Sequence, residues 1–184
     1  FSSIFTGLNF IVTVHKLRAP GMSWFKMPLM IWGLYATAIV QVLATPVLGI
    51  TLVLLMLEKV FGVGIFDPAM GGDPVLFQHF FWFYSHPAVY VMVLPGFAII
   101  LEILAHFSRK PLYAYRWVVG AFLGIVALSG VVWAHHMFTS GMADYLHAPF
   151  LLLTALTSIP TGIIFLAGLA TIRAGQLRLP TPIR

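Results

Sequence analysis

The sequence predicts an all-α membrane protein, a polytopic bundle of transmembrane helices. Of its 184 residues, 60% are hydrophobic and only 8% are charged, whereas roughly 25% of the residues of a soluble domain are charged. The apolar residues form runs long enough to cross a bilayer, which takes about 20 helical residues. The charges fall between these runs, so the net charge of +5 indicates membrane topology rather than a surface for nucleic acid.

One membrane domain with one partial and four complete spans is expected. Residues 1–14 are too short to cross the membrane alone, and the sequence does not begin with Met, so we expect a fragment that starts inside a helix. The complete spans are expected over residues 29–57, 75–107, 117–138 and 148–172. Proline is tolerated in transmembrane helices and marks kinks, so the prolines inside these runs do not divide them. Tyr and Trp near span ends, such as Trp32, are expected to anchor at the interface.

The basic residues predict the orientation of the spans. Nine of the ten lie in the first loop, the third loop and the tail: Lys16, Arg18, Lys26, Arg109, Lys110, Arg116, Arg173, Arg178 and Arg184. Lys59 alone lies in an opposite loop. Because positive charge concentrates on the cytoplasmic side of a membrane, these two loops and the tail are expected on the cytoplasmic or matrix side.

Three histidines are candidate metal ligands. His86 lies about eleven residues into the third span, roughly 16 Å from its outer end at about 1.5 Å per residue. His135 and His136 lie at the outer end of the fourth span, so all three can meet in the outer half of the membrane. Three neutral imidazoles suit copper or zinc, and copper has the higher affinity for nitrogen. Two adjacent histidines can bind one ion only if the helix loosens near them. A helix–helix hydrogen-bonding role remains the alternative for a lone histidine at this depth.

Two aromatic side chains share the face of His86. Tyr90 follows His86 by four residues and Trp82 precedes it by four, which places them one turn away on either side. A phenol beside a metal-bound imidazole can supply a hydrogen atom, and the indole would shelter the same face. With no cysteine in the chain, a thiolate metal site is excluded.

The chain resembles subunit I of the haem–copper oxygen reductases, the family that includes cytochrome c oxidase. The resemblance rests on these motifs: Arg18–Ala19–Pro20–Gly21–Met22, Phe66–Asp67–Pro68, Asp73–Pro74, Gln78–His79, Trp82, His86–Pro87–Ala88–Val89–Tyr90, Leu94–Pro95–Gly96–Phe97, Trp133–Ala134–His135–His136–Met137–Phe138–Thr139 and Ile159–Pro160–Thr161–Gly162. It covers nearly the whole chain. It implies a fragment of the twelve-helix haem–copper oxidase fold, from the end of helix IV through helix VIII.

The resemblance implies a copper site with His86, His135 and His136 as ligands, next to a haem whose ligands lie outside this chain. Tyr90 would be covalently joined to His86 and would give an electron and a proton when the O–O bond breaks. The resemblance also implies that Trp82 and Val89 lie beside the cofactors and that Thr154 and Thr161 belong to a proton path.

The family also implies an oxidoreductase that is not active as this fragment alone. It would reduce O₂ to water with proton uptake and proton pumping, and take electrons from cytochrome c or a similar donor through subunit II. The implied location is the bacterial plasma membrane rather than the mitochondrial inner membrane. Membrane lipid is an expected partner, and nucleic acid is not.

Departures from the family's commonest pattern concern proton delivery. Ala88 stands where a glutamate is usual, and Tyr84–Ser85 precede His86, as in a YSHP-type variant. Tyr84 is one turn before Ala88 on the same face, so its phenol can occupy the space of the carboxylate. Ile164 stands where many members have lysine and Leu101 where a serine is expected, so the lysine path is expected to be interrupted.

Two other functions are compatible with parts of the pattern. A nitric oxide reductase of the same superfamily is one, but such enzymes generally lack the tyrosine found here as Tyr90. A membrane transporter with a metal or proton site is the other. Transporters are typified by inverted repeats and broken half-helices, and the sequence contains no internal repeat.

Overall fold

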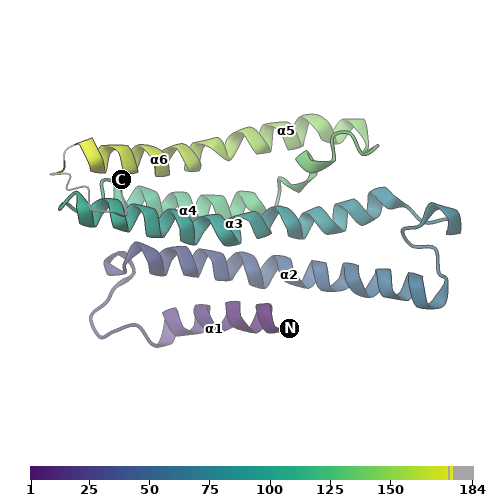
Figure 1. Ribbon diagram of the computed structural model, residues 1–184, viewed down its shortest axis with the longest axis horizontal. Helices are drawn as coiled ribbons and strands as arrows, with labels where there is room; N and C mark the ends of the chain where they lie inside the picture. The colour runs from purple at the N-terminus through teal and green to yellow at the C-terminus, as the bar shows by residue number, and fades with distance from the viewer. Residues whose placement is uncertain (174, 176–184) are drawn as a thin grey trace.

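The computed structural model describes residues 1–173 and 175, and over these residues the chain is helical with no strand. The helices lie side by side along one long axis (Figure 1). Their bounds are α1 Ser2–Lys16, α2 Leu29–Phe61, α3 Pro74–Phe107, α4 Tyr115–Ser129, α5 His147–Leu156 and α6 Ser158–Arg173, with 3₁₀ turns η1 Trp24–Lys26, η2 Pro68–Met70, η3 Trp133–Met137 and η4 Asp144–Leu146. This arrangement confirms the predicted all-α class.

Within the described residues, three helical segments are long and apolar enough to cross a membrane: Leu29–Phe61, Pro74–Phe107 and Asp144–Arg173. The first two correspond to α2 and α3, each continuous through the prolines inside it. The fourth apolar run forms the shorter helix α4, of 15 residues. The chain is thus an integral membrane helix bundle.

The helix expected over 117–138 is wrong beyond Ser129, where α4 ends. The Ser129 hydroxyl donates to the Val126 carbonyl at 2.8 Å, and Gly130 follows as the C-cap. Serine–glycine pairs are a frequent cause of helix interruption, because glycine is flexible and the hydroxyl competes for backbone groups. The chain then forms η3, so the α-helix ends before the histidine pair, as binding of one ion by two adjacent histidines requires.

The span expected over 148–172 is divided at Thr157 into α5 and α6. Pro160 has no N–H and cannot donate to the carbonyl one turn earlier. Three residues before this proline, the Thr157 hydroxyl donates to the Thr154 carbonyl at 2.6 Å. The two helices nevertheless follow one another in the same direction (Figure 1), so the interruption lies inside a single apolar segment.

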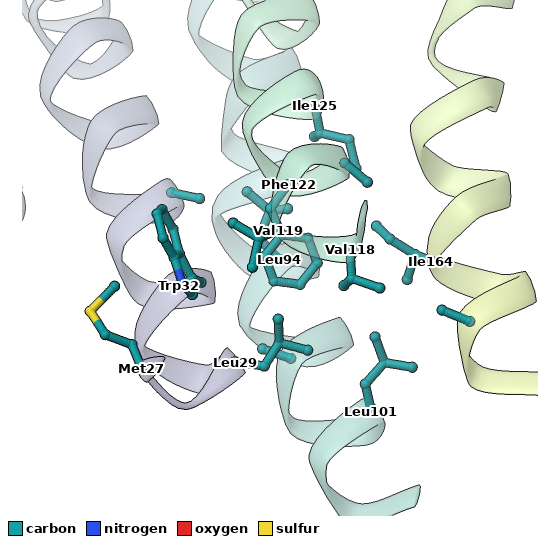
Figure 2. Packing of buried hydrophobic residues seen from close by; sticks show 14 of the residues in the cluster. Met27, Leu29, Trp32, Leu94, Leu101, Val118, Val119, Phe122, Ile125 and Ile164 are labelled. Carbon is teal, nitrogen blue, oxygen red and sulfur yellow. The ribbon is translucent and has the colours of Figure 1, made fainter. Parts of the chain in front are cut away.

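One apolar core joins α2, α3, α4 and α6 (Figure 2). Leu94, Phe122 and Ile164 are at most 2% exposed within it. Trp32 was expected at an interface, but it is buried in this core, and its indole N–H donates to the Trp24 carbonyl at 3.1 Å. The indole nitrogen therefore has a backbone partner and needs no interfacial water.

Helices α2 and α3 pack closely at Gly33. A Cβ atom built on this residue would lie 2.8 Å from the Ala98 Cβ atom and 3.2 Å from the Leu94 carbonyl oxygen. Such distances are below ordinary van der Waals contact, so any side chain here would push the two helices apart.

The α1–α2 loop, the α3–α4 loop and the end of α6 lie at the same end of the bundle (Figure 1). Lys110 fastens two of these segments, because its ammonium donates to the Ala170 carbonyl at 3.0 Å. Lys59 lies at the opposite end, on the last turn of α2. Arg178 and Arg184 lie outside the described residues. The two loops and the end of α6 that carry most of the basic residues therefore lie on one side of the bundle, as the positions of these residues in the sequence predict.

Glu58 closes the opposite end of the bundle. Its side chain is 2% exposed, and Oε2 accepts hydrogen bonds from the backbone N–H groups of Ile65, Phe66 and Asp67 at 3.0, 2.6 and 2.8 Å. The loop between α2 and α3 is thereby tied to the last turns of α2, and α3 starts from a fixed position.

Candidate metal centre

The three predicted ligands come together from two elements. His86 lies on α3, and His135 and His136 lie on η3. Their ligand nitrogens all lie within 4.8 Å of one another. His136 Nε2 is 3.2 Å from His86 Nδ1 and 3.1 Å from His135 Nε2. The adjacent histidines therefore turn their rings toward the same point, although they are neighbours in the chain.

These spacings fit a metal ion. Two nitrogens bound at about 2.0 Å to one tetrahedral ion lie roughly 3.3 Å apart. The His136 nitrogen lies within about 0.2 Å of that separation from each of its two neighbours. Imidazole nitrogens are ligands of copper and zinc, and the cluster thus has the donor set that the family's copper would need.

Thr154 of α5 sets the orientation of His135. Its hydroxyl donates to the Phe150 carbonyl at 2.6 Å, so its single proton is used. The contact of 2.9 Å between Thr154 Oγ1 and His135 Nδ1 is then a bond that the imidazole N–H donates. With its proton on Nδ1, His135 leaves Nε2 unprotonated and directed at His136. Partners of this kind fix the tautomer of metal-binding histidines. The sequence suggested Thr154 only as part of a proton path.

Aromatic rings lie beside the cluster. Trp82 stacks on His136 with ring centroids 4.1 Å apart and planes at 12°. Trp133, whose indole N–H donates to His79 Nδ1 at 3.3 Å, packs edge-on against Phe83. The spacing predicted Trp82 beside His86, and the stacking contact that it makes is with His136. The stacked indole covers one face of the His136 ring, while His136 itself stays exposed and His86 is buried.

Tyr90 lies against His86, with ring centroids 5.0 Å apart and planes at 68°. Among the described residues, the second nitrogen of His86, Nε2, is buried and has no hydrogen-bond partner. The phenol group of Tyr90 lies next to the side chain of Thr157, at the interruption between α5 and α6. Sequence reasoning missed Thr157, although its place three residues before Pro160 is a signal of a helix interruption.

Tyr84 and Ser85 lie on another side of α3. Tyr84 precedes His86 by two residues, which is about 200° around a helix. Together with Ala88 and Val89 they line a cavity of about 340 Å³ between α2 and α3. The structure does not bring Tyr84 or Ser85 into the histidine cluster.

The two positions at which the sequence predicts an interrupted lysine path are apolar and buried. Ile164 is 2% exposed and Leu101 is 4% exposed, both in the core. The Thr161 hydroxyl donates to the Thr157 carbonyl at 2.9 Å. Glu102, which follows Leu101, accepts a hydrogen bond from the Met30 backbone N–H at 2.9 Å and so caps the start of α2.

Comparisons with known proteins identify the family of this chain. The family described as Cytochrome C and Quinol oxidase polypeptide I matches residues 1–184. The chain is 44% identical to cytochrome c oxidase subunit 1 of Synechocystis sp. (strain ATCC 27184 / PCC 6803 / Kazusa), over 97% of this chain and 32% of the relative. It is 42% identical to the subunit of the same name in Cereibacter sphaeroides, over 99% and 32%, and 40% identical to that of Bacillus sp. (strain PS3), over 100% and 30%.

The chain thus spans about a third of the length of the curated relatives it matches. Within that third, the match runs from the first residue to the last. It includes the helices and the turn that carry the three histidines. The chain belongs to the cytochrome c and quinol oxidase polypeptide I family.

Proposed function

We propose that this chain is part of the catalytic subunit of a terminal respiratory oxidase that reduces O₂ to water in a bacterial plasma membrane. The observation that carries the proposal is the convergence of the His86, His135 and His136 nitrogens within 4.8 Å. The Thr154 contact, which leaves His135 Nε2 free to bind a metal, supports it. The relatives named above are called cytochrome c oxidase subunit 1, and all three come from bacteria.

His86 would hold copper through Nδ1, and His135 and His136 through Nε2. Copper and a haem bound by parts of the subunit outside this chain would supply the electron-transfer and oxygen-binding chemistry. The protein's own contribution is to fix three imidazoles in one orientation before any ion binds. It also places the Trp82 indole against His136 and the Tyr90 phenol against His86. Val89, on the cavity side of α3, would separate the histidines from the space beside α2.

Tyr90 would supply a hydrogen atom to the reaction: its O–H bond breaks, and the proton and one electron leave together. Its place beside His86 supports this role. The adjacent Thr157 hydroxyl would hold the phenol in place and help return its proton. The free Nε2 of His86 also offers the position for a bond to a Tyr90 ring carbon. That bond replaces one C–H and one N–H, and O₂ would accept the two hydrogens and their electrons.

Tyr84 and Ser85 would bring protons toward the site in place of the carboxylate that Ala88 lacks. A phenol and a hydroxyl can each donate and accept a hydrogen bond, so they can relay a proton through water. The buried apolar side chains of Ile164 and Leu101 make the lysine route unsuitable, which leaves the Tyr84 side as the main entry. Proton pumping coupled to the reaction would use the same side.

In the complete enzyme the partners would be a subunit II that receives electrons, a cytochrome c or similar donor, O₂ and membrane lipid. A nitric oxide reductase is the competing function. Tyr90 favours the oxidase, because reduction of NO requires no donor for the cleavage of an O–O bond, and the phenol lies at the histidine cluster.

Metal analysis of the full-length subunit in its complex tests the proposal. The wild-type enzyme is expected to contain one copper at this site and to consume O₂. His136→Ala removes the nitrogen that lies near both other ligands and is expected to abolish both properties. His106→Ala, in the last turn of α3, is the matched control and should keep both. A His136→Ala enzyme with a full copper content would refute the site.

A further inference from the structure

The cavity beside Tyr84 and Ser85 has a polar wall on α2. Gln41 and Thr45 line it, one turn apart on that helix. The cavity has a volume of about 340 Å³, and Tyr84 and Ser85 line it from α3. Residues four apart share one face of a helix. The α3 wall also contains Ala88, which leaves room that a longer side chain would fill.

Thr45 has a hydroxyl without a partner. Its Oγ1 atom is buried and makes no hydrogen bond among the described residues. Thr51 of α2 and Thr171 of α6 instead donate to the Val47 and Ala167 carbonyls, both at 2.7 Å, whereas Thr37 of α2 shares the unpartnered state of Thr45 but does not line the cavity. Buried hydroxyls are almost always satisfied by protein or by ordered water. The Thr45 hydroxyl at a cavity wall therefore points to a water molecule as its partner.

The size and polarity of the cavity suit ordered water. One water needs roughly 10–15 Å³ of such space and two to four polar partners, so the volume holds several molecules. The Gln41 amide offers donors and an acceptor, and the hydroxyls of Thr45, Ser85 and Tyr84 each offer both. The remaining wall is apolar, with Val40, Ala44, Val91 and Met92 among the lining residues. Water in this cavity would thus be held mainly by these four polar side chains.

We propose that Gln41 and Thr45 hold ordered water against Tyr84 and Ser85, and that this water is the connection through which the two α3 side chains receive protons. Gln41 and Thr45 are positioning residues, since they act on the water and not on the reacting atoms. Their role in proton delivery rests on the proposed oxidase function. The presence of water in the cavity does not, because it follows from the unpartnered Thr45 hydroxyl and the polar lining.

The first test is a high-resolution structure of the full-length enzyme complex. Ordered water within hydrogen-bonding distance of Thr45 Oγ1 and the Gln41 amide is expected. A cavity that is dry, or filled by a lipid chain or by another part of the subunit, would overturn the proposal. This result does not depend on oxidase activity.

The second test compares variants of the full-length enzyme. Thr45→Val and Gln41→Leu should each lower the rate of proton uptake about fivefold, the factor that one net hydrogen bond is worth. They should leave the copper content unchanged and alter the solvent isotope effect on turnover. Thr45→Ser should restore the rate, because it restores the hydroxyl. Thr51→Val is the matched control on α2, since its hydroxyl is satisfied within the helix, and it should retain the wild-type rate.

The outcomes separate the two proposals. Full proton uptake in both Thr45→Val and Gln41→Leu would refute the relay through this water while the copper site stands. A wild-type enzyme without copper or O₂ consumption would refute the proposed function, and the proton-delivery role of Gln41 and Thr45 would fall with it. The structural test would still decide whether the cavity holds water.

Discussion

Replacing Thr154 by valine tests whether the geometry around His135 is built for a metal. Valine has nearly the same shape as threonine but no hydroxyl. It removes the 2.9 Å contact to His135 Nδ1 and the 2.6 Å bond to the Phe150 carbonyl. The imidazole then loses the acceptor that keeps its proton on Nδ1 and its free nitrogen directed at His136.

The magnitude follows from the lost bond. An N–H group left unsatisfied in a partly buried position costs about 1–3 kcal/mol. Since about 1.4 kcal/mol is a tenfold change in an equilibrium constant, copper affinity should fall roughly 5- to 150-fold. Outer partners of metal-binding histidines typically contribute about 10- to 100-fold, which agrees with this range.

The assay is competition for copper between the full-length enzyme and a chelator of known affinity. Thr154→Ser should restore most of the affinity, because it retains the hydroxyl. Thr161→Val is the control, since the Thr161 hydroxyl bonds only the Thr157 carbonyl among the contacts of the described residues. An unchanged copper affinity in Thr154→Val would show that the hydroxyl does not orient His135.

Three further outcomes are expected. Tyr90→Phe should abolish O₂ turnover and leave copper bound, because only the hydroxyl beside His86 is lost; normal turnover would remove Tyr90 from the mechanism. Tyr84→Phe keeps the ring on the cavity wall and should slow proton uptake and turnover together, and a full rate would argue against the relay. Gly33→Ala should destabilise the enzyme by about 1–3 kcal/mol in thermal unfolding, because its Cβ would lie 2.8 Å from that of Ala98. Gly49→Ala on the same helix meets no atom within 4 Å and should not lower the unfolding temperature.

The fold class was predictable because burial in a membrane leaves a strong signal in composition. Long apolar runs gave α2 and α3 almost to their ends, since a helix is the one way for such a segment to satisfy its backbone in lipid. The interruptions at Ser129 and Thr157 were not predicted. One follows a Ser129–Gly130 pair and the other lies just before Pro160, and the mean hydropathy of a run does not register such local features.

The candidate site was predictable in part. The spacing of His86, Trp82 and Tyr90 sets them on one face of α3, and the structure keeps them there. The contact of Thr154 with His135 was not predictable, because it joins two elements whose relative position depends on the bend at η3. The polar wall formed by Gln41 and Thr45 was also missed. Both residues lie in the apolar segment over residues 29–57, which was interpreted only as a membrane span.

Glu58 also bears on the order in which the molecule assembles. Its three hydrogen bonds reach no further than nine residues along the chain. The histidine cluster instead needs residues fifty positions apart. Because closing a long loop costs more entropy than closing a short one, local contacts form early and distant ones late. The hairpin of α2 and α3 can therefore close while the chain beyond it is still emerging, whereas the three imidazoles meet only after α4 and η3 have docked, so a metal ion can be acquired only near the end of folding.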